Sequence, residues 1–295
     1  MSNSPSTPHR LLRVGLTLAV LCLAPAFLGG CAYFNTMYHA KKYYGDAQRE
    51  EKTEATRGAV QGQSRSNALY KQCVDKCQKM LEKHPGSKWE DDARLLLAKA
   101  YYGRRDFLSA RLELDAFLKL YPESGLRDEA VYWRGRTAYA LEDYDDAISV
   151  WRDLLEQNPK VKQREEIEYY MADALWQSKR SDAAILAYAE FLEEYPKSDL
   201  SWEARLKLGE VQLAQRSFEE AERLFEETSM RSPDETVRQR GLMSLGDCYE
   251  RQGRLEEALE LYVNLELQLD SQAFAGRISA EERRERREAE LAALQ

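Results

Sequence analysis

Hydrophobic residues recur every three or four positions over most of the chain, and polar residues fill the positions between them. One example is "ARLLLAKAYYGRRDF" followed by "LSARLELDAFLKLYP", and another is "RGLMSLGDCYERQGRL" followed by "EEALELYVNLELQ". Apolar residues at this spacing fall on one face of an α-helix. The pattern therefore predicts consecutive pairs of amphipathic helices.

A small set of residues repeats along the chain at a fixed interval of 37 positions. The repeated prolines are Pro85, Pro122, Pro159, Pro196 and Pro233. Twelve residues before each proline stands a small residue, and this series is Cys73, Ala110, Ala147, Ala184 and Ala221, continued by Ala258. The proline is expected to end the second helix of each pair, and the small residue is expected where two helices cross closely. Self-similarity at this period predicts an all-α solenoid of stacked helix pairs.

The repeat resembles the tetratricopeptide family, whose first helix carries Leu-Gly and Tyr and whose second helix carries Ala and an aromatic residue. The fullest match is formed by Leu242, Leu245, Gly246, Tyr249, Ala258 and Tyr262. That family has a period of about 34 residues. The three extra residues here fall in the turn after the proline, as in "YPESGLRDEA" and "YPKSDLSWEA". Such Pro-x-Ser turns are a feature of periplasmic members, among them the BamD-type lipoproteins. The resemblance implies an α-α superhelical solenoid over residues 67–270.

Residues 31–66, which precede the solenoid, depart from the repeat pattern and are predicted to form an anchor-proximal helix and a linker. The helix is expected over residues 33–57, and Gly58–Ser66 ("GAVQGQSRS") reads as a turn or linker. Residues 67–84 are the predicted partner of this first helix.

Residues 271–295, which follow the solenoid, are rich in Glu and Arg. Ser279 and Glu282 stand at the spacing of a helix capping box. A charged C-terminal capping helix is the favoured interpretation, and a coiled coil that binds a partner is the alternative.

Residues 1–30 have the layout of a secretory signal peptide. They hold Arg10 and Arg13, no acidic residue, and an apolar run from Val14 to Leu28. This run is too short to predict a membrane-spanning helix.

The sequence Leu28-Gly29-Gly30-Cys31 at the end of this segment resembles a bacterial lipobox. The resemblance implies that Cys31 becomes the first residue of the mature chain and carries a diacylglycerol and an N-acyl lipid. A plain signal anchor, or a buried cysteine, is the alternative. Because Ala32 is not the aspartate that retains lipoproteins at the inner membrane of enteric bacteria, the analogy favours the outer membrane. In a host with a single membrane, the same anchor would place the chain on the cell exterior.

The chain is acidic, with a formal net charge of −8 at pH 7. An acidic protein is repelled by the phosphate backbone of nucleic acids. We therefore expect no nucleic-acid partner.

The sequence offers little material for catalysis. Its three histidines, His9, His39 and His84, have no companions at the spacing of a metal site or a catalytic triad. It has no Gly-rich phosphate loop and no nucleophile elbow. We expect no catalytic residue, no metal site and no cofactor apart from the lipid. The rival hypothesis of an enzyme needs a catalytic domain, and the segments outside the repeats are too short for one.

Cys73 and Cys77 stand four residues apart on one predicted helix, a spacing that also suits a metal site. They occupy the alanine and aromatic positions of the repeat, which face the neighbouring helix. Buried structural cysteines are therefore the favoured interpretation.

The resemblance to the tetratricopeptide family also implies a peptide-binding groove lined by the first helix of each pair. Its predicted residues are Lys99, Tyr102, Tyr132, Arg136, Tyr139, Tyr169 and Trp176. Large aromatic side chains beside a cation suit a bound peptide, because the rings supply apolar area and the charge fixes orientation. Lys99 or Arg136 is expected to meet a peptide carboxylate. The alternative is that about half of these aromatics pack between helices.

These features together predict a non-enzymatic lipoprotein of the outer membrane that faces the periplasm and binds proteins or peptides. Its expected partners are a β-barrel assembly protein and the client peptides of that machinery. The alternatives are a CpoB-like coordinator of envelope constriction, and a scaffold for pili or for secretion or gliding machinery. The lipobox and the lack of long heptads argue against the CpoB-like alternative.

Overall fold

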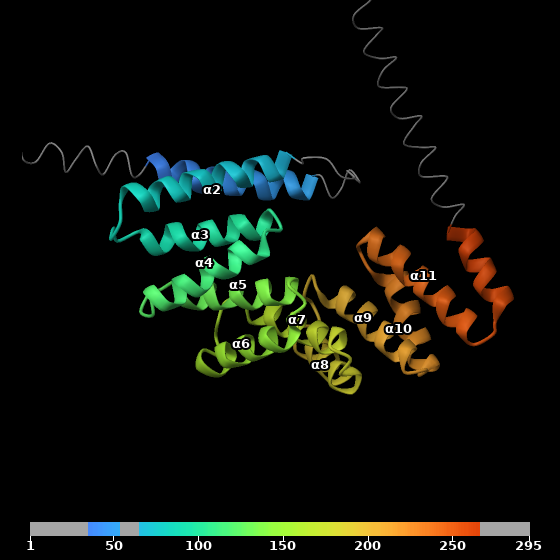
Figure 1. The fold of residues 1–295 in the computed structure, drawn as a ribbon. Helices are drawn as coiled ribbons and strands as arrows, with labels where there is room; N and C mark the ends of the chain where they lie inside the picture. The colour runs from blue at the N-terminus through green and yellow to red at the C-terminus, as the bar shows by residue number, and fades with distance from the viewer. Residues whose placement is uncertain (1–34, 54–64, 266–295) are drawn as a thin grey trace, which may run out of the picture. The chain divides into compact units, whose positions relative to one another are not determined.

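The computed structural model describes residues 35–53 and 65–265, and the regular structure within these ranges is α-helical throughout (Figure 1). The helical class predicted from the sequence is confirmed. The predicted signal peptide, the anchor residue Cys31, most of the predicted linker and the predicted C-terminal capping helix lie outside the described residues.

The chain divides into two units, Met1–Val161 and Lys162–Gln295. The first unit contains a helical segment at residues 35–53 and the helices α2 (Arg65–Lys83), α3 (Glu90–Gly103), α4 (Phe107–Leu120), α5 (Arg127–Ala140) and α6 (Tyr144–Gln157). The second unit contains the helices α7 (Arg164–Gln177), α8 (Ser181–Glu194), α9 (Ser201–Ala214), α10 (Phe218–Arg231) and α11 (Glu235–Arg251), and a helical segment at residues 255–265.

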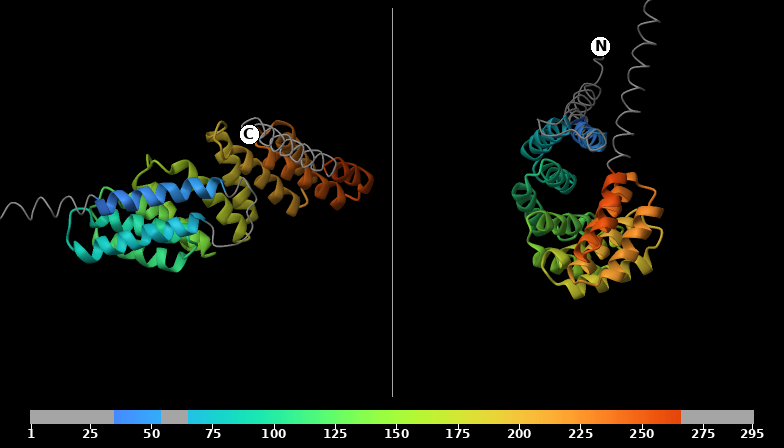
Figure 2. Two further views of the ribbon diagram at one scale, coloured as in Figure 1. Left: turned by 90° about the horizontal axis from the view of Figure 1, so that it is seen from above. Right: turned by 90° about the vertical axis from the view of Figure 1, so that its right-hand side faces the viewer.

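The predicted repeat of helix pairs is present in both units. Each helix from α3 to α10 is 14 residues long. Within each unit, every helix packs against the next one in sequence, and the first helices of successive pairs also touch, as α3 and α5 do. The segment at residues 35–53 lies beside α2 and completes the first pair (Figure 2). In that pair the rings of Tyr44 and Tyr70 meet edge to face at 5.7 Å.

A contact of a small residue against a large ring recurs in several of the helix pairs. The repeated alanines are buried, from 0% exposed at Ala147 to 2% at Ala258. On the second helix, Trp151, Tyr188 and Phe225 are also fully buried at corresponding positions. The ring of Trp151 lies against Gly135 so closely that a β-carbon there would overlap it, and Gly209 meets Phe225 in the same way. Glycine in the first helix therefore makes room for the ring of the second.

From α3 onward, the turn within each described pair has a conformation that the sequence did not reveal. Arg105, Glu142, Lys179 and Arg216 all have a positive φ between 61° and 64°, and Gly253 continues the series. In the first of these turns the amide of Asp106 donates to the carbonyl of Tyr101 at 3.0 Å, and that of Arg105 donates to Tyr102 at 2.9 Å. This is the Schellman ending of a helix, which favours glycine at the left-handed position. Four non-glycine residues adopt it here.

The turn between successive pairs contains a hydrogen bond that explains the Pro-x-Ser sequence. The Ser124 hydroxyl accepts from the amide of Leu126 at 3.1 Å and donates to Asp91 of the preceding pair at 2.7 Å. The Ser198 hydroxyl likewise accepts from the amide of Leu200 and donates to the carboxylate of Glu165. We call this side-chain bond between successive turns a rung.

A third rung uses an amide in place of serine. The Asn158 side chain donates to Asp128 at 2.7 Å. Each rung links the start of a pair's first helix to the turn that leads into the next pair.

The contact between Gly135 and Trp151 can be tested with Gly135→Ala. A helical Gly→Ala change normally stabilises by about 1 kcal/mol, but the added methyl group would overpack against a fully buried ring, at a cost of about 1–3 kcal/mol. We expect a lower free energy of unfolding, measured by chemical denaturation. The control is Gly45→Ala, in the helical segment at residues 35–53, where a β-carbon would meet nothing within 4 Å. That change should stabilise, and equal effects of the two substitutions would contradict the packing argument.

Candidate peptide-binding surface

Five of the seven predicted groove residues lie on two neighbouring helices of the first unit. Lys99 and Tyr102 belong to α3, and Tyr132, Arg136 and Tyr139 belong to α5. Residues three or four apart share one face of a helix. Since α3 and α5 touch, their two faces adjoin.

Arg136 occupies the centre of this region. Its guanidinium donates hydrogen bonds to the hydroxyl of Tyr132 at 2.8 Å and to the hydroxyl of Tyr102 at 3.4 Å. The guanidinium carbon is 5.8 Å from the ring centroids of both tyrosines. These distances permit cation–π attraction, and the two hydroxyls fix the side chain in one orientation.

Trp133, which sequence reasoning did not select, joins the same group of side chains. Its ring meets Tyr102 edge to face at 5.2 Å and Tyr132 at 5.5 Å. The Lys99 ammonium lies 5.4 Å from the Trp133 ring centroid. We call Lys99, Tyr102, Tyr132, Trp133 and Arg136 the cation–aromatic cluster.

The two cations of the cluster differ in their partners. The Lys99 ammonium is 2.7 Å from the Glu129 carboxylate, and its side chain is 20% exposed. A peptide carboxylate would therefore compete with Glu129 for Lys99. Arg136 is held by two phenolic hydroxyls, an arrangement that orders a guanidinium before any ligand arrives.

The other three predicted groove residues are not members of this cluster. Tyr139 packs on Tyr144 at 5.5 Å, within the first unit. Tyr169 and Trp176 are on α7 in the second unit, where Tyr169 is only 7% exposed and packs against Phe191 at 5.8 Å. Tyr132 is similarly buried, at 4%. The expectation that some of these aromatics pack between helices agrees with this burial, and the peptide-binding role of the set stays a prediction.

The Cys77 thiol and the Tyr44 phenol keep their protons. Cys73, Cys77 and Cys248 are free and buried, as predicted for the first two. A hydrogen bond with Cys73, followed by burial, raises the pKa of the Cys77 thiol. Burial likewise raises the pKa of Tyr44, which lies below the Lys99 ammonium. The Cys77 thiol and the Tyr44 phenol are therefore neutral near pH 7.

On the opposite side of α5, the buried Arg134 forms an ion triad with two partly exposed carboxylates. It is 2.7 Å from Asp115 on α4 and 2.6 Å from Asp146 on α6, and its side chain is 10% exposed. Residues two apart on a helix point in different directions, so Arg134 fixes α5 while Arg136 belongs to the cluster.

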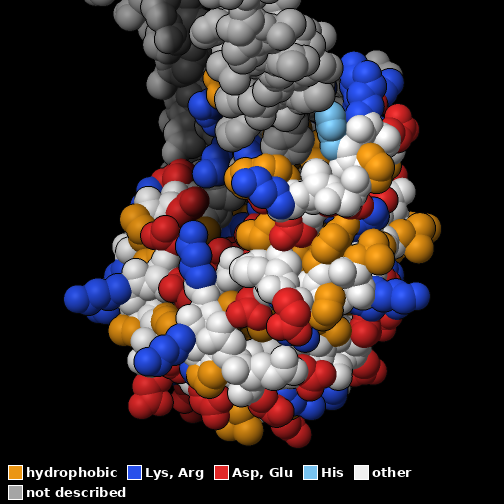
Figure 3. Space-filling model, turned by 90° about the vertical axis from the view of Figure 1, so that its left-hand side faces the viewer, with side chains coloured by type: hydrophobic (Ala, Val, Ile, Leu, Met, Phe, Trp, Pro, Cys, Tyr) orange, Lys and Arg blue, Asp and Glu red, His pale blue; other side chains and the backbone are white. Residues whose placement is uncertain are grey.

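On the face seen in Figure 3, acidic and basic side chains are interspersed with hydrophobic ones.

Comparison with known protein families identifies the family of this chain. The model of the family described as "YfiO: Outer membrane lipoprotein" matches residues 52–212, which is more than half of the sequence. The chain belongs to the YfiO family, the BamD-like outer membrane lipoproteins. A tetratricopeptide-repeat model matches residues 237–274 of this YfiO-family chain. The resemblance predicted from the sequence is confirmed.

Solved structures similar to this YfiO-family chain include a tetratricopeptide repeat protein from Parabacteroides merdae, with 15% identity, a TM-score of 0.55, and coverage of 76% of this chain and 79% of that one. BtubC (BKLC) from P. vanneervenii has 15% identity and a TM-score of 0.54, and the match covers 68% of this chain and 88% of that one. These likenesses show the solenoid fold alone. A search among curated protein sequences finds no match.

The matched region contains the whole cation–aromatic cluster. Within residues 35–53 and 65–265 of this YfiO-family protein, no helix is both long and apolar enough to cross a bilayer.

The ion triad predicts that Arg134→Ala destabilises the first unit. The change removes the cation that Asp115 and Asp146 share, but both carboxylates are partly solvated and Asp146 keeps Arg111 at 4.0 Å. We therefore expect a loss of about 1–3 kcal/mol, less than for a fully buried pair. Urea denaturation followed by circular dichroism would measure it. Arg223→Ala is the matched control, because Arg223 is 64% exposed and pairs only with Glu220 three residues away. An Arg134 effect as small as that of the control would contradict a structural role for the triad.

Proposed function

We propose that this protein is a non-enzymatic scaffold lipoprotein of outer-membrane β-barrel assembly, which binds a β-barrel assembly protein and the peptides of its clients. The observation that carries the proposal is the YfiO-family match over residues 52–212. The stacked helix pairs support it, because such solenoids offer extended surfaces to other proteins.

The membrane attachment is part of the same proposal. We place a diacylglycerol and an N-acyl chain on Cys31, at the end of the signal peptide, with the protein facing the periplasm. The description of the family as outer membrane lipoproteins supports this placement. Two or more acyl chains give stable anchoring where a single chain gives only reversible binding.

The cation–aromatic cluster is the proposed contact for client peptides. An ordered guanidinium beside several rings suits a segment that ends in an aromatic residue and a carboxylate, since the charges attract and the rings pack. Arg136 is the proposed carboxylate partner, and Tyr102 and Trp133 are the proposed ring contacts. Tyr139, Tyr169 and Trp176 remain candidate contacts for the rest of the peptide.

The assembly role can be tested by purifying the acylated protein from its own envelope in detergent and identifying co-purifying proteins by mass spectrometry. We expect a β-barrel protein that carries POTRA-type domains. The control is Cys31→Ser, which should lose acyl labelling and move to the soluble fraction. Recovery of Tol-Pal, pilus, secretion or gliding components instead would replace the proposed function with one of the alternatives.

The peptide contact can be tested with a labelled peptide that ends in phenylalanine and a free carboxylate, using the acylated protein in detergent. Arg136→Gln should weaken binding at least tenfold, or about 1.4 kcal/mol. The same peptide with an amidated end should bind both proteins equally weakly. Arg223→Gln is the matched control, and Trp176→Ala reports whether α7 takes part. Unchanged affinity of Arg136→Gln with intact helicity would remove the proposed contact.

A further inference from the structure

The helical segment at residues 35–53 has two faces of different chemistry, and one of them packs on α2. On this inner face Met37, Ala40 and Ala47 are buried in the same hydrophobic cluster as residues of α2. Farther along it, the Glu51 carboxylate accepts a hydrogen bond from the Tyr70 hydroxyl at 2.7 Å. These contacts hold the segment against the first unit, so its other face is turned outward.

The outward face is basic. It is formed by Tyr38, Lys41, Lys42, Arg49 and Lys52, which are all exposed, and Tyr38 is 63% exposed. Their spacing of three, four or seven positions places them on one side of the helix. With about 3.6 residues per turn, the acidic residues of the segment fall outside this side. We call these five residues the basic face.

Two cations of the basic face have carboxylate partners and remain accessible to another anion. The Lys41 ammonium is 3.1 Å from Asp92 of α3, and its side chain is 59% exposed. Arg49 pairs with Asp46 at the edge of the face, and its side chain is 78% exposed. Exposed pairs of this kind are weak, because water solvates both charges. The basic face can therefore present its cations to a larger anionic surface.

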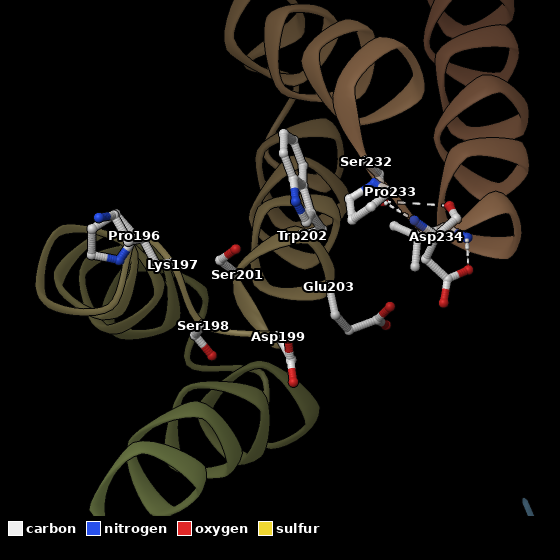
Figure 4. Close-up of a pocket in the computed structure, with 11 residues that line it drawn as sticks. Pro196, Lys197, Ser198, Asp199, Ser201, Trp202, Glu203, Ser232, Pro233 and Asp234 are labelled. Atoms are coloured by element: carbon white, nitrogen blue, oxygen red, sulfur yellow. Dashed lines mark hydrogen bonds between the residues drawn. The ribbon is translucent and has the colours of Figure 1, made fainter.

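The sign of the basic face is opposite to that of the chain as a whole, whose formal net charge is −8. In the second unit, for example, the pocket between the turns before α9 and α11 is lined by three carboxylates and one ammonium (Figure 4). The terminal helix of a solenoid needs a polar outer face for solubility, but acidic residues would serve that purpose equally well. Four cations without an acid among them fit an anionic neighbour better than solvent alone.

The basic face begins close to the proposed lipid anchor. Cys31 stands four residues before Asn35, the first residue that the structure describes. Since a chain spans at most about 3.6 Å per residue, Cys31 lies within about 14 Å of the start of the helix. Tyr38 follows in the first helical turn, and tyrosine is a residue type that favours the headgroup level of a bilayer. From Tyr38 to Lys52 the face is about 21 Å long.

We propose that the basic face lies against the anionic phosphate headgroups of the membrane that holds the lipid anchor. This inference rests on the proposed acylation of Cys31. The Tyr38 ring sits among the headgroups, and the four cations meet the phosphates along the helix. The anchor strengthens these weak contacts because it keeps the face near the surface at a high effective concentration. Anchor and face together then fix how the first unit is oriented on the membrane.

The test uses the full acylated protein in phosphatidylcholine vesicles, with or without phosphatidylglycerol, that carry a nitroxide quencher on some headgroups. Gly45 lies within the basic face, and a β-carbon there would meet nothing within 4 Å, so Gly45→Cys provides a site for a fluorescent maleimide. The native Cys73, Cys77 and Cys248 are buried and thus protected from the label. Ser149→Cys, at an exposed position on α6, the last helix of the same unit, is the matched control (Figure 1).

In vesicles with phosphatidylglycerol, we expect the label at position 45 to be quenched at least twofold more than the label at position 149. This excess should fall when phosphatidylglycerol is omitted or salt is raised. Lys42→Glu combined with Lys52→Glu should abolish it. Lys119→Glu combined with Arg152→Glu makes the same charge change at exposed positions of α4 and α6 and should leave it intact.

Flotation of the vesicles separates this inference from the anchor on which it rests. Every variant should float, because its acyl chains are unchanged, and circular dichroism should show unchanged helicity. Floating protein with equal quenching at positions 45 and 149, or quenching that survives Lys42→Glu with Lys52→Glu, would overturn the membrane contact alone. Protein that does not float would overturn the anchor and this inference with it. Neither result bears on the pull-down that tests the assembly role.

Discussion

The architecture depends on one contact that recurs along the chain, a glycine on the first helix of a pair beneath a large ring on the second. Gly135 beneath Trp151 is the tightest example, and Gly209 beneath Phe225 follows it. Helices can approach this closely only where one of them lacks a side chain, and dense packing then leaves no space for alternatives. Because α5 is fixed in this way, Arg136 and Trp133 on its other faces are held in a defined place.

Two kinds of polar contact add to this apolar one. The Arg134 triad joins three helices within the first unit. The rungs join successive turns, and their serine also completes its own turn through a backbone amide. Each element of the extended Pro-x-Ser turn therefore has a physical role, and the longer repeat period is the result of adding it.

Sequence reasoning could predict the helix pairs, their period and the buried alanines, because these depend on residues that recur at fixed spacing. It could not predict the left-handed residues at Arg105 and Lys179, since neither residue type signals a turn. Trp133 was overlooked because the predicted groove residues follow the groove positions that the family resemblance implies, and Trp133 stands one place beyond Tyr132. The adjacent pair Tyr132-Trp133, repeated as Tyr169-Tyr170, was the signal that could have pointed to it. Sequence reasoning also did not predict the rungs between successive turns, because the period shows which residues recur but not which side chains meet.

The neighbour-to-neighbour packing also bears on how the chain reaches its folded state. Each described helix packs mainly against those next to it in sequence, so few contacts join distant parts of the polypeptide. Folds of this kind have low contact order and form quickly, because little loop entropy is lost before the first contacts are made. A polypeptide that crosses a membrane unfolded could therefore complete its first helix pairs while later ones are still being translocated.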